Sequence, residues 1–566
     1  MIKVAGEIRQ SYVLALVMLL SICLNLWGNS WGTPDKWHPD EVVDEATALV
    51  KNKSLNLHFF AYGGLPYYVV AATAVLPVGV YNLTVDRKPA EDSGAAIAQW
   101  RDRKNSNLKI AARTVSAVMG TLLVYFTYLI GDILFGTWPG VLAAAFLAVC
   151  PYFVEIAHFS TVDMAGNFWF WLSCLCSLKI WKDGKRRWYL WAAFTAGLAT
   201  GVKADRLLAV LPMVVAQFLR QDRLGPGLRR ILGYGLLVPI GYIVANPTLL
   251  FAPFEFLDGM TRELYFNILR GSGITSYVTL VEDMQAGMGL LLFAASFASL
   301  AFLLYEFARG RHRRETGWLL SIVIPYYLVF GSRLSLPWYN PLFYPALAII
   351  AAYGCVSLLQ TLRLRSTIFA GMAAAIIVAA IGVFSLAKSV AVDLQFTHDA
   401  RYLAARWIGK NIPPGSVIEV GRRGPQLPAD NYHLVQRSNT PSEFYDEFRT
   451  WSSDLDNYRP YQRVRESIRR FEKATRDSFG LRPREPYQAW FDRALSYRSL
   501  GDNSNNERIV ADYRVLVDYL DFALVKDCQA PNSGYRLLTR VHYEAPFHLS
   551  SAFPFVNPTV YVFKRQ

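Results

Sequence analysis

Acidic side chains crowd a short segment near the beginning of the chain. Four carboxylates fall within six residues, directly after His38-Pro39, namely Asp40, Glu41, Asp44 and Glu45. A carboxylate in such a position could act as a general base that takes the proton from an attacking hydroxyl. The same residues also suit the first turn of a helix beginning near Val42, where negative charge is favoured. Composition alone leaves both interpretations open.

A second polar segment follows further along, where Asp163 comes five residues after His158. Asp163 could orient a substrate, and His158 could bind a phosphate or a metal. Thr161 and Asp163 also precede an apolar run, which is typical of a helix N-terminus capped by a short polar side chain.

Three cations could contact an anionic substrate. Lys203 lies between two apolar runs and could neutralise a phosphate leaving group as negative charge develops on it. It could instead extend along apolar surface and pair with Asp205. Arg333 could make a bidentate phosphate contact, and Arg113 is a third candidate.

A metal site is a further hypothesis. His38, Asp40, His58 and Asp163 have side chains that suit a divalent ion such as zinc or manganese. The sequence contains no HExxH, no P-loop, no GxGxxG at a strand-to-helix turn and no GxSxG. No cofactor is therefore indicated with certainty.

The composition of the chain predicts a membrane protein. Of its 566 residues 53% are hydrophobic, and the mean hydropathy is +0.20. Several uncharged runs are long enough to cross a bilayer, namely Ser11–Gly28, Ile231–Pro253, Ala286–Tyr305, Leu334–Leu362 and Ser366–Ala387. Shorter runs lie at 65–83, 108–131, 137–154, 164–178, 188–202 and 207–219. We predict a polytopic α-helical protein with about 11–13 transmembrane helices within 1–389.

The net charge of +14 is explained by the positive-inside rule rather than by nucleic-acid binding. Basic residues cluster in short loops, near 182–187, 220–230, 309–314 and 363–365. Placing these loops in the cytoplasm puts Asp40, Asp163, Lys203 and Arg333 together on the extracytoplasmic face. One inconsistency remains, because three apolar runs separate Asp40 from Asp163, whereas two sites on one face require an even number of crossings.

The segment 390–566 differs in composition and predicts a small extracytoplasmic α/β domain. A helical pattern around Tyr402–Ile408 stops at the Pro413-Pro414-Gly415 turn. Strand-like runs follow at Ser416–Val420, Phe522–Val525 and Thr559–Phe563. The six cysteines are scattered without paired spacing, so no disulfide framework is expected.

An ordered set of motifs resembles a known family. His38-Pro39-Asp40-Glu41 in a first loop of about 30–66, followed by Tyr62-Gly63-Gly64-Leu65-Pro66, is similar to the GT-C glycosyltransferase superfamily. The similarity extends to its protein-mannosyltransferase-like (family 39-type) bacterial branch. It continues through 112–117, His158–Asp163, Gly197–Lys203, Asn246-Pro247 and the opening of the tail at 399–415, and covers roughly residues 1–420.

The resemblance implies a specific activity. Members of the superfamily are inverting enzymes that take a sugar from a polyprenyl-phosphate donor and pass it to an acceptor, which here could be a glycan, lipid or protein. It implies that Asp40 is the catalytic base, with Glu41 and Asp163 beside it, in a bacterial inner membrane. Substrate contacts would come from His38, Tyr62, Arg113, His158, Lys203 and Arg333. The family's Arg-Tyr pair is altered, because Tyr339 follows Arg333 only after several residues.

Two other classes of protein fit part of the pattern. A multi-span transporter or flippase would also bury charges within many helices, but the chain shows no repeated halves. An envelope glycan polymerase or ligase would use a diphosphate-linked donor instead. The sequence names neither the sugar nor the acceptor.

Overall fold

The computed structural model describes most of the chain. The described ranges are 2–89, 94–220, 224–270, 277–332, 337–365, 368–421, 423–428, 430–437, 458–479, 511–517, 525–526, 528–530, 534–546 and 556–566.

Helices form most of the described structure up to Asn411. In chain order they are α1 (Ile2–Leu26), α2 (Val43–Asn52), α3 (Leu65–Val70), η1 (Ala71–Val75), α4 (Leu76–Thr84), α5 (Gly94–Phe135), α6 (Thr137–Ala148), α7 (Pro151–Ala157), α8 (Val162–Asp183), α9 (Arg186–Val202), η2 (Ala204–Ala209), α10 (Val210–Leu219), α11 (Leu224–Gly235), α12 (Leu237–Ala245), α13 (Thr248–Phe251), α14 (Pro253–Arg270), α15 (Tyr277–Met288), α16 (Leu290–Ala308), α17 (Arg313–Gly331), η3 (Pro337–Leu342), α18 (Tyr344–Arg365), α19 (Ile368–Thr397) and α20 (Ala400–Asn411). The later elements are β1 (Val417–Gly421), β2 (His433–Arg437), α22 (Arg459–Phe479), β3 (Tyr513–Val517), β4 (Tyr535–Val541) and β5 (Val560–Arg565).

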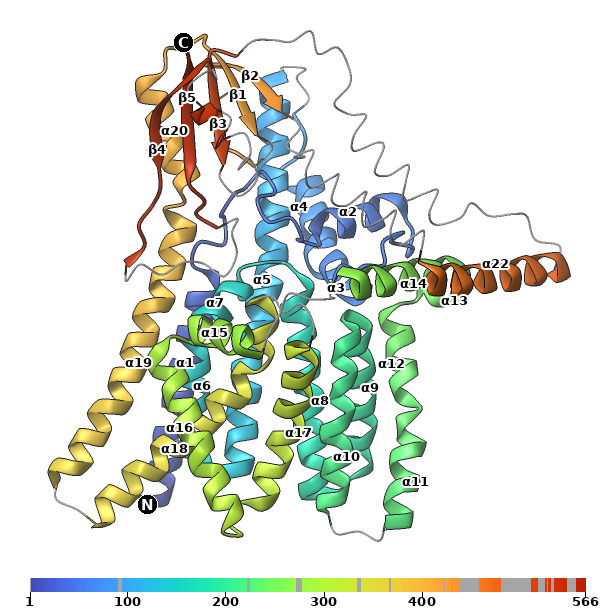
Figure 1. The fold of residues 1–566 in the computed structure, drawn as a ribbon, viewed down its shortest axis with the longest axis vertical. Coiled ribbons are helices and arrows are strands. Elements are labelled where there is room, and N and C mark those ends of the chain that lie inside the picture. Colours follow the sequence, from blue (N-terminus) through green and yellow to red (C-terminus); the bar gives the residue numbers. More distant parts are fainter. Residues whose placement is uncertain are drawn as a thin grey trace.

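Most of the longer helices form an elongated bundle (Figure 1). The two longest, α5 and α19, continue beyond one end of the bundle, on the side of the C-terminal sheet. Short connections join the antiparallel helices. Between α8 and α9, Gly184 has a φ of +62°, a left-handed conformation that glycine adopts without strain at a helix C-terminus.

Apolar helices confirm an integral membrane protein. Judged by length and composition, five of the described helices could cross a bilayer: Leu65–Thr84, Ala96–Phe135, Leu290–Ala308, Tyr344–Leu362 and Gly371–Asn411. The bent pair Thr137–Ala148 and Pro151–Ala157 would make a sixth. Other bundle helices, such as α9 and α10, are shorter than 18 residues, and the predicted total of about 11–13 spans stays a prediction.

The position of Leu65–Thr84 bears on the inconsistency found in the sequence. Figure 1 shows α2, α3 and α4 gathered beside the upper half of α5, above the end of α12. The apolar run at 65–83 therefore does not extend through the bundle. Two of the three runs between Asp40 and Asp163 then pass along the bundle, while Leu65–Thr84 is still long and apolar enough to cross a bilayer, and the shared face stays a prediction.

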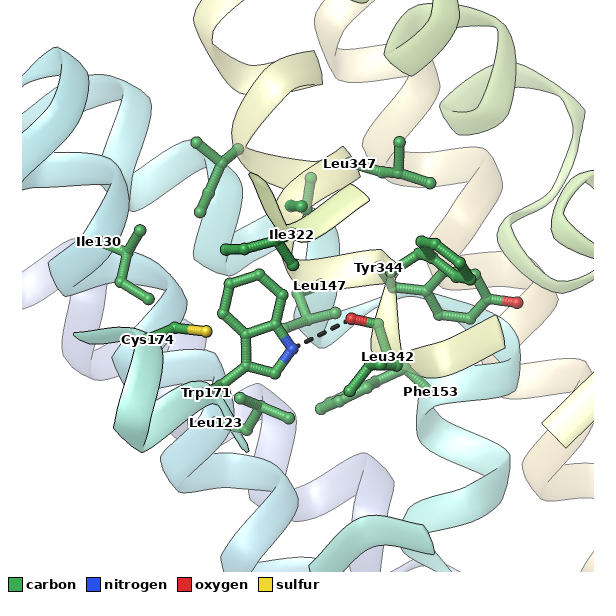
Figure 2. Packing of buried hydrophobic residues seen from close by; sticks show 14 of the residues in the cluster. Leu123, Ile130, Leu147, Phe153, Trp171, Cys174, Ile322, Leu342, Tyr344 and Leu347 are labelled. Carbon is green, nitrogen blue, oxygen red and sulfur yellow. Dashed lines mark hydrogen bonds between the residues drawn. The ribbon is translucent and has the colours of Figure 1, made fainter. Parts of the chain in front are cut away.

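A large apolar core joins helices that are distant in the sequence. Figure 2 shows Trp171 of α8 beside Leu123, Leu147 and Ile322, which come from three other helices, α5, α6 and α17. The Trp171 indole N–H donates to the carbonyl of Leu342 at 3.1 Å, which satisfies its buried polar atom. This hydrogen bond and the surrounding apolar core fix η3 against α8.

The C-terminal segment confirms the predicted small sheet. The strand order is β2-β1-β3-β5-β4, with β1 parallel to both β2 and β3, and β5 antiparallel to both β3 and β4. The predicted strands at Ser416–Val420 and Thr559–Phe563 correspond to β1 and β5, and α20 is the predicted helix. Residues 522–524 of the third predicted strand lie outside the described residues, and Val525 is helical.

Candidate functional site

A buried ion pair fixes the first loop. Arg113 on α5 donates from Nε and Nη2 to the two carboxylate oxygens of Glu41, at 2.6 and 3.0 Å. Its Nη1 donates to the carbonyls of Asn29 and Trp31 at 2.9 and 2.5 Å. Arg113 and Glu41 are each 1% exposed. This bidentate geometry is the strong form of the carboxylate contact, and it sets the path of the loop on both sides of Asp40.

Asp40 differs from its neighbour, because the residue keeps solvent-exposed surface although protein surrounds much of its carboxyl group. The backbone on either side is held. The Asp40 N–H donates to Nδ1 of the buried His38 at 3.0 Å, and the Val42 N–H donates to the carbonyl of Ser160 at 2.9 Å. Burial by surrounding protein and the charge of Asp163 raise the pKa of Asp40. Asp40 thus lies within electrostatic range of Asp163 while it remains accessible to solvent.

Asp163 and Lys203 form the second part of the site. The Lys203 ammonium donates to Oδ1 of Asp163 at 2.5 Å and lies 4.6 Å from the ring centre of Tyr339 and 5.7 Å from that of Tyr62. Of the two interpretations of Lys203, the pairing with Asp205 is not found, because Lys203 pairs with Asp163 and Asp205 pairs with Arg206. The phosphate contact stays a prediction. The prediction that Thr161 and Asp163 cap α8 is wrong. Thr161 occupies the N-cap position without a side-chain cap bond, and Asp163 lies in the first turn.

Lys203 lies where α9 ends. Val202 is the last residue of α9, and Lys203 is extended, with φ −142° and ψ +132°. The Gly63 N–H donates to the Val202 carbonyl at 3.0 Å, and the Gly64 N–H donates to Oδ1 of Asn246 at 2.8 Å. The loop that carries Tyr62 is thereby attached to the segment that carries Lys203.

Gly63 permits this close approach, and its replacement should disturb it. A Cβ at Gly63 would lie 1.4 Å from the carbonyl oxygen of Gly201, so backbone would have to move. We expect Gly63→Ala to lower stability by about 1–3 kcal/mol and to weaken binding at Lys203. Thermal unfolding of the detergent-solubilised protein checks the first effect. Gly79→Ala is the matched control, since nothing lies within 4 Å of its Cβ. An equal melting temperature for the two variants would contradict the expectation.

Two further cations lie near Asp40. The charges of Lys36, Lys203 and Arg423 each act to lower the pKa of Asp40, against burial and Asp163. Lys36 also forms a 3.1 Å ion pair with Asp44. Arg423 follows β1, and no local pattern in the sequence pointed to it. Burial and the carboxylates of Asp40 and Asp163 raise the pKa of Tyr62 well above its usual value, so its hydroxyl stays a proton donor.

The C-terminal domain holds the opposite side of the first loop. Asp399 accepts from the Trp31 indole at 2.9 Å and from the backbone N–H of Asn557 at 2.9 Å. The Arg401 guanidinium donates to both of its oxygens, at 2.9 and 2.8 Å. Gln426 donates to the carbonyls of Gly32 and Thr33 at 3.2 and 3.1 Å. The site loop is therefore enclosed by residues from both ends of the chain.

Some predicted site residues lie elsewhere. His158 is 2% exposed, its ring nitrogens lie 2.8 Å from the Val154 carbonyl and 2.7 Å from the Trp27 carbonyl, and it stacks on Phe396 at 4.4 Å. Arg333 lies outside the described residues.

The hypothetical metal ligands are not brought together. His58 pairs with Glu255, at 2.5 Å between Nδ1 and Oε1, and Asp163 pairs with Lys203. Across the described ranges, no group of three or more His, Cys, Asp or Glu side chains could hold a metal ion.

A family model matches the middle of the chain. Residues 105–251 match the family described as dolichyl-phosphate-mannose-protein mannosyltransferase. This segment contains Arg113, Asp163, Lys203 and Asn246 but not Asp40. The match confirms the predicted resemblance over this part of the sequence. No curated protein matches the sequence significantly.

Several solved structures are similar to the chain at low identity. One is the apo oligosaccharyltransferase of Archaeoglobus fulgidus, at 14% identity and a TM-score of 0.45, covering 71% of this chain and 58% of that one. Another is the oligosaccharyltransferase AglB from Archaeoglobus fulgidus in complex with an inhibitory peptide and a dolichol-phosphate. Its identity is 13% and its TM-score 0.46, and the match covers 72% of this chain and 58% of that one. The chain thus spans less than two thirds of these archaeal chains. A third is ArnT from Cupriavidus metallidurans bound to undecaprenyl phosphate, with 13% identity and a TM-score of 0.46. This match covers 99% of this chain and 98% of that one.

Proposed function

We propose that the protein is an inverting GT-C glycosyltransferase that moves a sugar from a polyprenyl-phosphate donor to an acceptor hydroxyl. The observation that carries the proposal is an accessible Asp40 carboxylate beside the Asp163–Lys203 ion pair. The family match at 105–251 supports it, because that segment supplies Asp163 and Lys203. The sugar, a hexose or a pentose, and the acceptor are left open.

The proposed reaction is a single in-line displacement. The acceptor oxygen attacks the anomeric carbon and gives its proton to the Asp40 carboxylate. The bond from that carbon to the phosphate oxygen breaks, and its electron pair leaves with the polyprenyl phosphate. A base with a raised pKa takes the proton more readily than an ordinary aspartate does. Positioning and charge carry the rest of the rate enhancement.

Cations around Asp40 would hold the donor phosphate. Lys203 is already paired with Asp163, so this pair contributes no net charge. Lys36 and Arg423 supply the excess positive charge, and the rings of Tyr62 and Tyr339 keep the Lys203 ammonium in place. Charge that develops on the leaving phosphate would be stabilised by these preorganised groups. Asp163 would orient Lys203 and the acceptor.

Glu41 and Arg113 would act by positioning rather than by contact with substrate. Both side chains are buried and bind each other at two points. The residue types alone left both Asp40 and Glu41 open as the base, and the family resemblance implied Asp40. Their different exposure favours Asp40.

We place the site on the extracytoplasmic face of a bacterial inner membrane. The turns at 183–186 and 309–313 lie at the opposite end of the bundle from the sheet (Figure 1), and both are basic. The catalytic unit would then be 1–389 and the outer domain 390–566, although α19 extends to Thr397. A lipid donor would enter from the surrounding leaflet.

The proposal is tested with purified protein and a radiolabelled polyprenyl-phosphate sugar. Transfer of label to a hydroxyl acceptor, with release of polyprenyl phosphate, would support an enzyme of this class. Movement of intact donor between leaflets without release would instead identify a transporter. Turnover with a diphosphate-linked donor alone would identify a polymerase or ligase.

Replacement of Lys203 should weaken donor binding. Lys203→Ala removes a charge-assisted contact, so we expect the dissociation constant of the donor to rise roughly ten- to hundredfold. Binding of labelled donor to the detergent-solubilised protein measures this. Lys182→Ala, an exposed lysine at the far end of α8, should leave affinity unchanged. Equal affinity for wild type and Lys203→Ala would show that Lys203 serves only as the partner of Asp163.

The pH dependence of transfer should report the environment of Asp40. The base must be deprotonated, so kcat/KM should fall as pH decreases through its raised pKa. This acid limb should lie above the value of about 3.9 for an ordinary aspartate. Asp163→Asn removes one cause of the shift, so the limb should move to lower pH, while burial keeps part of the shift. A limb that stays in place or moves to higher pH would contradict this account.

A further inference from the structure

Helix α22 lies outside the site and packs along one side of α14. The two helices are antiparallel, because Phe254 near the beginning of α14 contacts Phe471 at 5.7 Å, and Tyr265 contacts Tyr461 at 5.7 Å. Asp258 and Arg465 lie 3.6 Å apart between them. Figure 1 shows both helices crossing the end of the bundle nearly at right angles to α12, with α22 extending outward past it.

The face of α22 toward α14 is defined by its spacing. Tyr461, Arg465, Ile468 and Glu472 are buried or half-buried. Their spacing of four, three and four residues places them on one side of the helix. Two large apolar residues seven positions apart, Val464 and Phe471, form an exposed edge beside this face, and Phe471 is 67% exposed.

The rest of the α22 surface is basic. The helix carries seven Arg or Lys and three Asp or Glu. Arg459, Arg463 and Lys473 are exposed. Arg470 is exposed as well, and its charge is partly offset by Glu466 at 3.4 Å. A helix with an apolar edge and an excess of basic residues suits the surface of an anionic bilayer.

The neighbouring helices continue the apolar edge. Exposed apolar residues occur on α13, at Leu250 and Phe251, and on α14, at Leu257 and Leu264. Both helices directly follow α12, whose own exposed Ile240 and Val244 lie on the bundle. The exposed apolar surface therefore extends from the bundle onto α13, α14 and α22, at the level where a membrane-crossing helix would leave the bilayer.

We propose that α13, α14 and α22 form a membrane-surface platform that binds anionic phospholipids. Val464 and Phe471 enter the outer part of the bilayer, and Arg459, Arg463 and Arg470, which lie together on the outward side of α22, contact the phosphates and anionic headgroups. The partner is the lipid surface, not a soluble anion. The inference does not depend on the proposed transfer reaction and holds for any protein with this arrangement.

Spin-label accessibility of the full chain in lipid nanodiscs tests the platform. The exposed Cys23 is first changed to serine, since the other cysteines are buried. A nitroxide is then attached at Phe471→Cys or, as the matched control, at Gln462→Cys, which lies on the opposite side of α22. In phosphatidylglycerol nanodiscs the label at 471 should collide mainly with oxygen, and the label at 462 mainly with a water-soluble nickel chelate. Equal nickel accessibility at both positions would overturn the proposal and would indicate a solvated helix or one that docks a soluble partner.

The basic face is tested in the Phe471→Cys background. Changing Arg459, Arg463 and Arg470 to glutamine should reduce the equilibrium constant for the lipid-inserted state by roughly ten- to hundredfold. When the basic residues are unchanged, replacing phosphatidylglycerol by phosphatidylcholine in the nanodiscs should lower this equilibrium constant to a similar extent. An unaltered melting temperature shows that the triple variant is folded. Insertion that is independent of both headgroup and charge would overturn the anionic-lipid assignment.

Discussion

Replacing Asp40 with asparagine should reduce sugar transfer by roughly 10²–10⁴-fold, the range that general-base catalysis supplies. Asparagine is nearly the same size but cannot accept the proton of the acceptor hydroxyl. Within the described part of the chain, the Asp40 carboxylate makes no hydrogen bond or ion pair, so its loss removes no structural contact. Initial rates with a labelled polyprenyl-phosphate sugar measure the effect.

The Asp40→Asn variant should keep the melting temperature and donor affinity of the wild type. Its matched control is Asp44→Asn, which loses a nearby exposed carboxylate in the first turn of α2 and its 3.1 Å pair with Lys36. We expect the control to transfer sugar at close to the wild-type rate. Transfer by Asp40→Asn at the rate of the control would remove Asp40 from the mechanism.

Replacing Glu41 with glutamine should instead destabilise the fold, by about 3–5 kcal/mol. The substitution leaves the Arg113 guanidinium buried with two backbone carbonyls but no counter-charge. Removing one partner of a buried pair is costly because the other charge remains out of water. Denaturant or thermal unfolding in detergent measures the loss.

A double variant separates the ion pair from other causes. Glu41→Gln combined with Arg113→Met removes both charges, so it should be less destabilised than Glu41→Gln alone. Asp44→Asn should cost under about 1 kcal/mol, because its ion pair is at the surface. A Glu41→Gln variant as stable as Asp44→Asn would show that the pair does not hold the loop.

The membrane character of the chain and its small C-terminal sheet could be predicted from sequence, because apolar runs and strand patterns are local. The partners of individual side chains could not. Trp31 and Asp399 are separated by 368 positions, and no spacing rule connects them. Glu41 and Asp40 are adjacent and chemically alike, so only the position of Arg113 distinguishes the buried carboxylate from the exposed one.

The pairing of Lys203 with Asp163 rather than with Asp205 has a physical cause. The sequence suggested pairing with Asp205, which is two residues away. The backbone leaves the α9 conformation at Lys203, and η2 begins at the next residue. The local spacing therefore does not fix the direction of the ammonium, and the carboxylate of Asp163 on α8 becomes its partner. Composition likewise cannot distinguish a helix beside α5 from one that extends through the bundle, as the run at 65–83 illustrates.

The Asp399 carboxylate has a consequence for how the molecule opens. It binds Trp31 before the acidic segment, Arg401 in α20 and Asn557 before the last strand. If any one of these segments opens locally, the buried Asp399 carboxylate loses a hydrogen-bond donor, which weakens its hold on the other two segments. Residues 27–42 and the C-terminal sheet should consequently unfold as one cooperative unit. Their amide hydrogens would then exchange with solvent at similar rates, despite lying at opposite ends of the sequence.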